Sequence, residues 1–140
     1  MFIEDGSFVT VKVYSRKMGY SYAALGEKEF IASKIKEEDK KKYQCLTVQM
    51  LVLDWGLYNE LQESAMIPDE ATGERRFNYK VYKEHRIQRL IKEWDAKDAK
   101  GNLVPVNESN LRKLSPNIAE AILGEYDTQA YMSENEEKKS

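Results

Sequence analysis

The sequence is poor in the residues that build disulfides and metal centres. Its 140 residues include a single cysteine, Cys45, and a single histidine, His85. One cysteine cannot form an internal disulfide, which indicates a reducing compartment. A zinc site of the Cys/His type is excluded by count. Both residues fall within helical patterns and outside any nucleophile motif, so we interpret them as structural rather than as a catalytic pair.

Long apolar runs are also missing. No stretch approaches the roughly 20 apolar residues of a membrane span. The N-terminus carries acids where a signal peptide carries bases. The formal net charge is only −2, so no overall field draws the chain to nucleic acid or to anionic lipid. We therefore expect no membrane partner, no export and a cytoplasmic location.

Signatures of catalysis are absent too. The sequence has no phosphate-binding glycine loop, dinucleotide fingerprint, nucleophile elbow or paired-carboxylate motif. Asp95, Asp98 and Gly101 superficially resemble a calcium loop, but Lys97 and Ala99 occupy positions that need oxygen ligands. We therefore expect a protein that is not an enzyme and that holds no cofactor or metal.

What is present is apolar periodicity. After the turn signal Asp5-Gly6, Val9, Val11 and Val13 alternate with bulkier or polar residues, which predicts a strand in a small hairpin over 1–20. The longest helical pattern predicts one core helix over 41–64, whose surplus apolar surface either faces a partner or is covered by the hairpin and the last helix. Its stripe comprises Tyr43, Leu46, Met50, Leu53, Leu57 and Leu61.

Further helices are predicted downstream. Ile87, Leu90, Ile91 and Trp94 place one over 78–94, and Asn107 or Ser109 caps a short one ending near Leu114. Ser115-Pro116 starts the last helix. The expected fold is mainly α (α+β), a small N-terminal β-hairpin followed by a bundle of about four helices. We expect one domain over 1–127, with a hairpin segment (1–20) and a helical part (21–127), then a flexible polar tail over 128–140.

The segment 75–92 interleaves bases with aromatic residues. Tyr82, Arg86 and Arg89 share one helical stripe, which suits either a protein interface or binding of phosphates and bases. A solvated face whose long stems cover the edge of the core is the third interpretation. The slightly acidic chain favours a protein over nucleic acid as the partner.

The C-terminal third carries a resemblance. A tryptophan, an aspartate-rich turn with "GN", the run "LVPV", the capped "NESNLRKLSP" and the final "NIAEAILGEY" follow in order. This order resembles the C-terminal half of the tail assembly chaperones of long-tailed, siphovirus-like bacteriophages. The matching residues are Trp94, Asp98, Gly101, Pro105, Leu111, Leu114, Pro116, Ile118, Ala121 and Ile122.

The resemblance implies a phage protein of the host cytoplasm that binds the tape measure protein, assists assembly of tail tube subunits and self-associates. The residues that we expect to contact a partner are Met50, Leu53, Trp55, Leu57, Leu61, Tyr82, Arg86 and Arg89. Two alternatives stay open. One is a nucleic-acid-binding accessory protein that uses the basic helix 75–92, and the other is a structural protein of the tail or neck of the virion.

Overall fold

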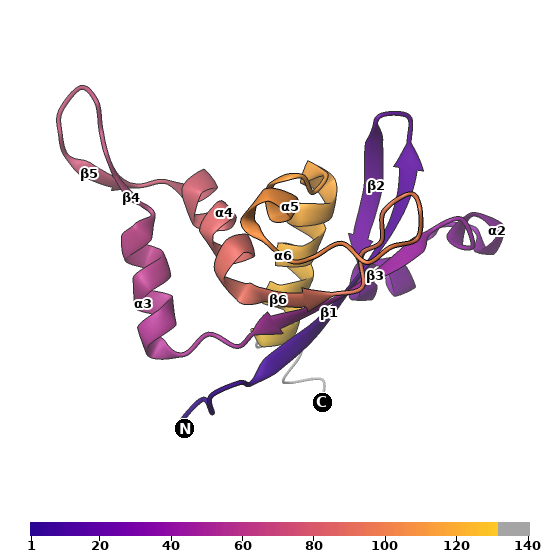
Figure 1. The fold of residues 1–140 in the computed structure, drawn as a ribbon, viewed down its shortest axis with the longest axis horizontal. Helices are drawn as coiled ribbons and strands as arrows, with labels where there is room; N and C mark the ends of the chain where they lie inside the picture. Colours follow the sequence, from indigo (N-terminus) through magenta and orange to yellow (C-terminus); the bar gives the residue numbers. More distant parts are fainter. Residues whose placement is uncertain (132–140) are drawn as a thin grey trace.

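The computed structural model describes residues 1–131 and shows an α+β fold organised by an antiparallel sheet. One long helix covers a face of this sheet, and a helical arm extends from its side (Figure 1). In chain order the elements are β1 (Phe8–Met18), β2 (Ser21–Gly26), α1 (Glu27–Ala32), α2 (Glu37–Lys40), β3 (Gln44–Leu51), α3 (Trp55–Ser64), β4 (Met66–Pro68), β5 (Arg75–Phe77), α4 (Tyr79–Leu90), β6 (Ile91–Trp94), α5 (Glu108–Arg112) and α6 (Pro116–Ala130).

The main sheet has the strand order β2-β1-β3-β6, and all three pairings are antiparallel. β1 is the long central strand, and it forms because its valines alternate with residues of the opposite face. Val11 lies opposite Val48 of β3, and both side chains are fully buried. The valine face of β1 is therefore the floor of the core.

Helix α6 forms the roof of the core by packing across β1 and β2. Pro116 occupies its first turn, where a missing N–H does no harm, although the side chain of Ser115 makes no capping bond. Ile122 and Tyr126 are fully buried against the sheet. The hydroxyl of Tyr126 donates a hydrogen bond of 2.8 Å to the carbonyl of Leu51, which fixes the helix to the end of β3.

The arm consists of α3, the β4–β5 hairpin and α4. Asp54 caps α3 by accepting from the N–H of Leu57, and Asn78 caps α4 by accepting from the N–H of Val81. Figure 1 shows α3 and the hairpin projecting away from the main sheet. Because α3 packs mainly on α4, much of its surface stays open to solvent.

A closed turn follows β6. The indole N–H of Trp94 donates to the carbonyl of Val104 at 2.6 Å, and the carboxylate of Asp98 accepts from the N–H groups of Lys100 and Asn102. Gly101 has a φ of 83°, which favours glycine. The residues of the phage-like pattern that lie in this turn thus have structural roles.

The predicted hairpin and helical bundle are wrong. The 2–4 segment forms no strand, and the partner of β1 is β2, joined to it by a turn in which Gly19 has a φ of 66°. The Asp5-Gly6 turn exists, with Gly6 at a φ of 77°, but it precedes the first strand without making a hairpin. The N-terminal strand was therefore predicted correctly, and its partner was not.

The predicted helix 41–64 is also wrong, because its first half is strand β3. Leu46, Val48 and Met50 alternate toward the core, and the spacing from Leu46 to Met50 fits a strand as well as a helix. Only the part from Trp55 onward is helical. The two ends of the predicted stripe therefore belong to different layers of the fold.

The boundaries of the later elements shift as well. The helix predicted over 78–94 ends at Leu90, and its last residues pair with β3 as β6. Residues 75–77 of the predicted basic helix form β5. Asn107 does cap α5, as one of the two expected caps. Helix α6 continues to Ala130, beyond the predicted start of the tail, and residues 132–140 of that tail lie outside the described residues.

Candidate protein-binding surface

Exposed aromatic side chains gather on the arm and beside the end of α6. We call this set the aromatic surface. Trp55 is 76% exposed and Tyr79 is 60% exposed, values that are unusual for rings of this size. The members are Trp55, Tyr58, Phe77, Tyr79, Tyr82 and Tyr131, of which Tyr82 alone is half-buried.

Ring contacts connect these residues into two groups. Trp55 and Tyr58 are one helical turn apart on α3, and their rings stack with centroids 6.0 Å apart. Tyr82 on α4 lies 5.2 Å from the ring of Phe77 and 6.4 Å from that of Tyr79. Both groups present rings that are already held in place, which lowers the entropy cost of binding.

Tyr131 is an exposed ring that directly follows α6. Partial burial raises the pKa of its phenol, and the positive charge of Arg86 opposes this shift. The aromatic surface thus takes its residues from α3, from the segment 77–82 and from the end of α6, three parts that are far apart in the sequence.

A paired arginine lies beneath this surface. Arg86 is 4% exposed, and its guanidinium sits 5.5 Å from the ring of Tyr82 and 5.6 Å from that of Tyr126. It donates to the carboxylate of Asp127 on α6. Burial alone would lower the pKa of Arg86, but the hydrogen bonds and charge of Asp127 outweigh this, and the pKa is raised. Arg86 thus stays charged and locks α4 to α6.

The predicted partner-contacting residues are divided by the fold. Met50 and Leu61 are buried in the core, and Leu53 and Leu57 are half-buried. Among the predicted contact residues from Met50 to Leu61, Trp55 is the exposed one. The five residues span β3 and α3, so they do not form one exposed groove.

On α4 the structure brings Tyr82 and Arg86 together, whereas Arg89 points toward α3. The Nη2 atom of Arg89 lies 2.8 Å from Oε2 of Glu60, an exposed ion pair between the two helices. Tyr82 contributes to the aromatic surface, Arg86 supports it from below, and Arg89 braces its α3 side. These three side chains therefore act in different ways, although they share a helical stripe.

Two other bases of the segment, Arg75 and Lys83, are also paired with acids. Arg75 pairs with Glu63 at 2.9 Å, and Lys83 pairs with Glu120 at a nitrogen–oxygen distance of 2.6 Å. Exposed pairs of this kind are weak and can open, but they reduce the positive potential that phosphates need. Four bases of the segment, Arg75, Lys83, Arg86 and Arg89, are thus held by ion pairs instead of forming an open row of cations.

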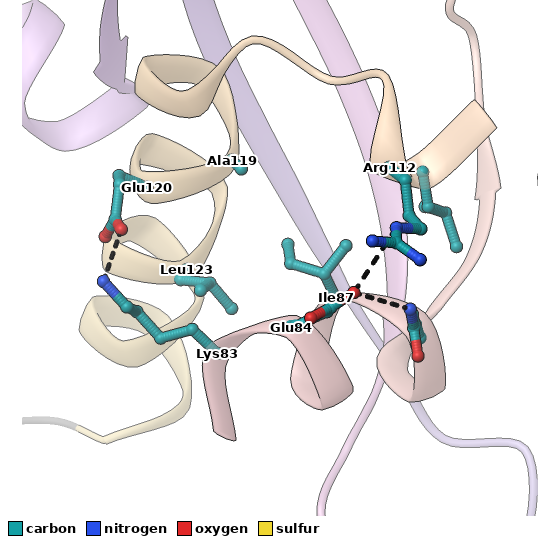
Figure 2. Close-up of a pocket in the computed structure, with 9 residues that line it drawn as sticks. Lys83, Glu84, Ile87, Arg112, Ala119, Glu120 and Leu123 are labelled. Carbon is teal, nitrogen blue, oxygen red and sulfur yellow. Dashed lines mark hydrogen bonds and ion pairs between the residues drawn. The ribbon is translucent and has the colours of Figure 1, made fainter. Parts of the chain in front are cut away.

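A groove lies on another side of α4, where it meets α5 and α6 (Figure 2). Its volume is about 300 Å³, and apolar side chains including Ile87, Leu111 and Leu123 line it. In Figure 2, Lys83 reaches Glu120 on one side and Arg112 reaches Glu84 on the other. This groove is small and bordered by internal ion pairs, so it is a weaker candidate for binding than the aromatic surface.

Sequence reasoning missed Tyr58, Tyr131 and Asp127. The spacing Trp55-x-x-Tyr58 is a usable signal, because residues three apart on a helix lie on one side. The pairing of Asp127 with Arg86 has no comparable signal, since it depends on how α6 packs against α4. Contacts between elements that are distant in the sequence therefore have to be known before these residues can be identified.

Comparisons with known proteins return nothing: no family model, curated protein or solved structure matches this chain. Within residues 1–131, no group of three or more His, Cys, Asp or Glu side chains is arranged to hold a metal ion. Over the same residues, none of the helices has both the length and the apolar character needed to cross a membrane.

Proposed function

We propose that this chain is a non-enzymatic protein-binding factor whose aromatic surface contacts its client. On the sequence resemblance, we propose more specifically a tail assembly chaperone in the host cytoplasm. Its client is then the tape measure protein of a long-tailed phage, and it assists assembly of tail tube subunits around that client. The observation that carries the proposal is the set of exposed rings on the arm, with the buried ion pair of Arg86 and Asp127 beneath Tyr82.

The chemistry of the surface supports a protein partner. Trp, Tyr and Arg supply most of the binding energy at protein interfaces, where large rings bury area at little entropy cost. The stacked pair of Trp55 and Tyr58 offers such an anchor at the open side of α3. An amphipathic helical client can place its apolar stripe against these rings.

The test is co-expression with the tape measure protein of the same genome, followed by affinity purification and light scattering. We expect a soluble complex with several copies of this chain per client. The double variant Trp55→Ala/Tyr58→Ala should lose the complex while remaining folded, because both rings are substantially exposed. Tyr20→Ala is the matched control, since Tyr20 is fully exposed on the turn between β1 and β2.

Contrary outcomes are distinct. If the double variant still forms the complex, the client binds elsewhere on the chain. If neither the unsubstituted chain nor the Tyr20→Ala control forms a complex, the chaperone assignment is overturned. Salt-sensitive binding to single-stranded DNA that requires Arg89 would instead favour the nucleic-acid alternative. Detection of the chain in purified virions would favour a structural protein of the tail or neck.

A further inference from the structure

A second surface lies at the edge of the main sheet, away from the aromatic surface. β2 is an edge strand, and no strand among residues 1–131 pairs with its outer side. Helix α6 packs beside it and leaves a groove of about 490 Å³ between strand and helix. The lining residues include Ala24, Glu29, Asn117, Ala121, Gly124 and Glu125.

Backbone groups of β2 face this groove. The side-chain amide of Asn117 donates to the carbonyl of Tyr22 at 2.8 Å, so that carbonyl points away from β1. Along an antiparallel strand the backbone groups of every second residue point to the same side. The N–H and C=O of Ala24, two residues after Tyr22, therefore also point away from β1. The hydrogen bonds between β1 and β3 support this direction. The N–H of Val52 donates to the carbonyl of Ser7, so every second residue from Ser7 to Ser15 turns its backbone groups toward β3. Ser15 lies opposite Ala24, so these two residues exchange no hydrogen bonds.

Small side chains make the groove accessible to another backbone. Ala24 lines the strand side, and Ala121 and Gly124 line the helix side. A Cβ atom placed on Gly124 would meet nothing within 4 Å, so the space beside it is open. An added strand needs to approach to about 4.8 Å, which small residues permit.

The charge of the groove is one-sided. Glu29, Glu120 and Glu125 line it, and no lysine or arginine does. Lys83 offsets Glu120. Glu125 is 5% exposed, and its Oε1 accepts from the side chain of Gln129 at 3.1 Å and, more weakly, from the N–H of Lys28 at 3.4 Å. A buried carboxylate at one end of an open strand edge favours a cationic ligand.

We propose that this groove binds an extended basic segment of a partner protein, which adds to the outer edge of β2 as a fifth strand. Its backbone pairs with the outward N–H and C=O of Ala24, and a lysine or arginine side chain contacts Glu125 and Glu29. This is strand addition, in which backbone bonds give affinity and alternate side chains give specificity. It does not depend on the aromatic surface or on the function proposed for it.

The experiment titrates the full ¹⁵N-labelled chain with a blocked synthetic octapeptide of alternating threonine and lysine. We expect amide shifts at Ala24 and Gly26 and slower hydrogen exchange at the N–H of Ala24. A peptide of alternating threonine and glutamate should bind at least tenfold more weakly. A threonine–lysine peptide that is N-methylated at every residue should also fail, because it has no N–H to pair with the strand.

Two variants at one position provide matched controls. Gly124→Phe should fill the groove and abolish binding, whereas Gly124→Ala should retain it. Glu125→Gln should weaken the basic peptide about tenfold and leave the acidic peptide unchanged. Trp55→Ala/Tyr58→Ala should leave peptide binding intact, which separates this site from the aromatic surface.

The proposal is overturned by any of three results. One is an absence of shifts at Ala24 and Gly26 when the lysine peptide is saturating. The second is equal affinity for the acidic peptide. The third is undiminished binding by Gly124→Phe once its spectrum shows a folded protein. If that variant does not fold, the peptide series and Glu125→Gln decide the question alone.

Discussion

Arg86 on α4 and Asp127 on α6 form an ion pair with unequal burial. The side chain of Arg86 is 5% exposed, whereas that of Asp127 is 47% exposed. The second contact of the pair, from Nη1 to Oδ2, measures 3.4 Å, and Nε of Arg86 has no partner among the described residues. The carboxylate is therefore the guanidinium's main source of compensation, while water can compensate the carboxylate.

This inequality predicts that the two halves of the pair respond differently to removal. Asp127→Ala leaves a buried, uncompensated guanidinium and should lower the free energy of unfolding by about 3 kcal/mol. Arg86→Met fills a similar volume and leaves a carboxylate that water can reach, so it should cost about half as much. Urea denaturation at pH 7 measures both values. Equal losses in the free energy of unfolding would show that the deeper burial of the arginine does not decide which half of the pair costs more to remove.

Tyr126 predicts a dependence on alkaline pH. Burial raises the pKa of its phenol to about 12, from an ordinary value of 10. The folded protein thus favours the protonated phenol, and this contribution to stability is present below pH 10 and is lost as pH rises toward 12. At pH 8, Tyr126→Phe should cost about 1 kcal/mol through the lost bond to Leu51.

The measurement compares urea denaturation of both proteins at pH 8 and pH 11. The deficit of Tyr126→Phe should shrink or reverse at the higher pH, because the variant has no buried phenol to ionise. Tyr14 also has a raised pKa, but it is present in both proteins and cancels in the difference. Because the charge of Tyr131 helps to raise the pKa of Tyr126, both proteins also carry Tyr131→Phe. A constant deficit would show that ionisation of Tyr126 is not linked to folding.

Local signals in the sequence located parts of the fold and missed its organisation. Pro116 marked the start of α6 and the alternating valines marked β1, because both depend on neighbouring residues. β3 was missed, since Leu46 and Met50 fit two periods and only pairing with β1 decides between them. The available signal was Asp54, whose carboxylate caps α3 after the strand has ended.

The same distinction applies to the candidate surface. Tyr82 was found from its helical spacing, and Trp55 was expected to contact a partner as part of a longer stripe. Arg86, beneath Tyr82, pairs with Asp127 of α6, a helix that approaches the arm from the far end of the chain. A contact between elements separated by this much sequence leaves no local pattern to detect.

Trp94 predicts a local effect on the turn that follows β6. Trp94→Phe keeps most of the ring but leaves the carbonyl of Val104 without its 2.6 Å donor, so we expect a loss of about 1 kcal/mol. Val104 also donates its own N–H to Ala96 across the same turn. Exchange of the Val104 amide hydrogen should therefore accelerate, while exchange of buried amides in β1 follows the global stability. Unchanged exchange at Val104 would mean that the indole does not hold the turn.

The surroundings of Gly26 and Gly124 predict that an added methyl group lowers the stability at the first position and raises it at the second. A Cβ atom on Gly26 would lie 2.5 Å from Oε2 and 2.8 Å from Cβ of Glu125, too close for either atom to stay in place. Gly26→Ala should therefore cost about 1 to 3 kcal/mol through overpacking. Gly124→Ala meets nothing within 4 Å and lies within α6, so it should stabilise by up to about 1 kcal/mol.

A double variant identifies the cause of the Gly26 effect. Glu125→Ala removes the carboxylate but keeps Cβ, so combining it with Gly26→Ala should recover part of the loss. Thermal denaturation of the four proteins in this cycle gives the coupling between the two positions. Because Gly26 has a φ of −62°, which alanine adopts without strain, backbone conformation cannot account for a loss. Additive effects would therefore show that the close approach of β2 to α6 does not limit which residue position 26 accepts.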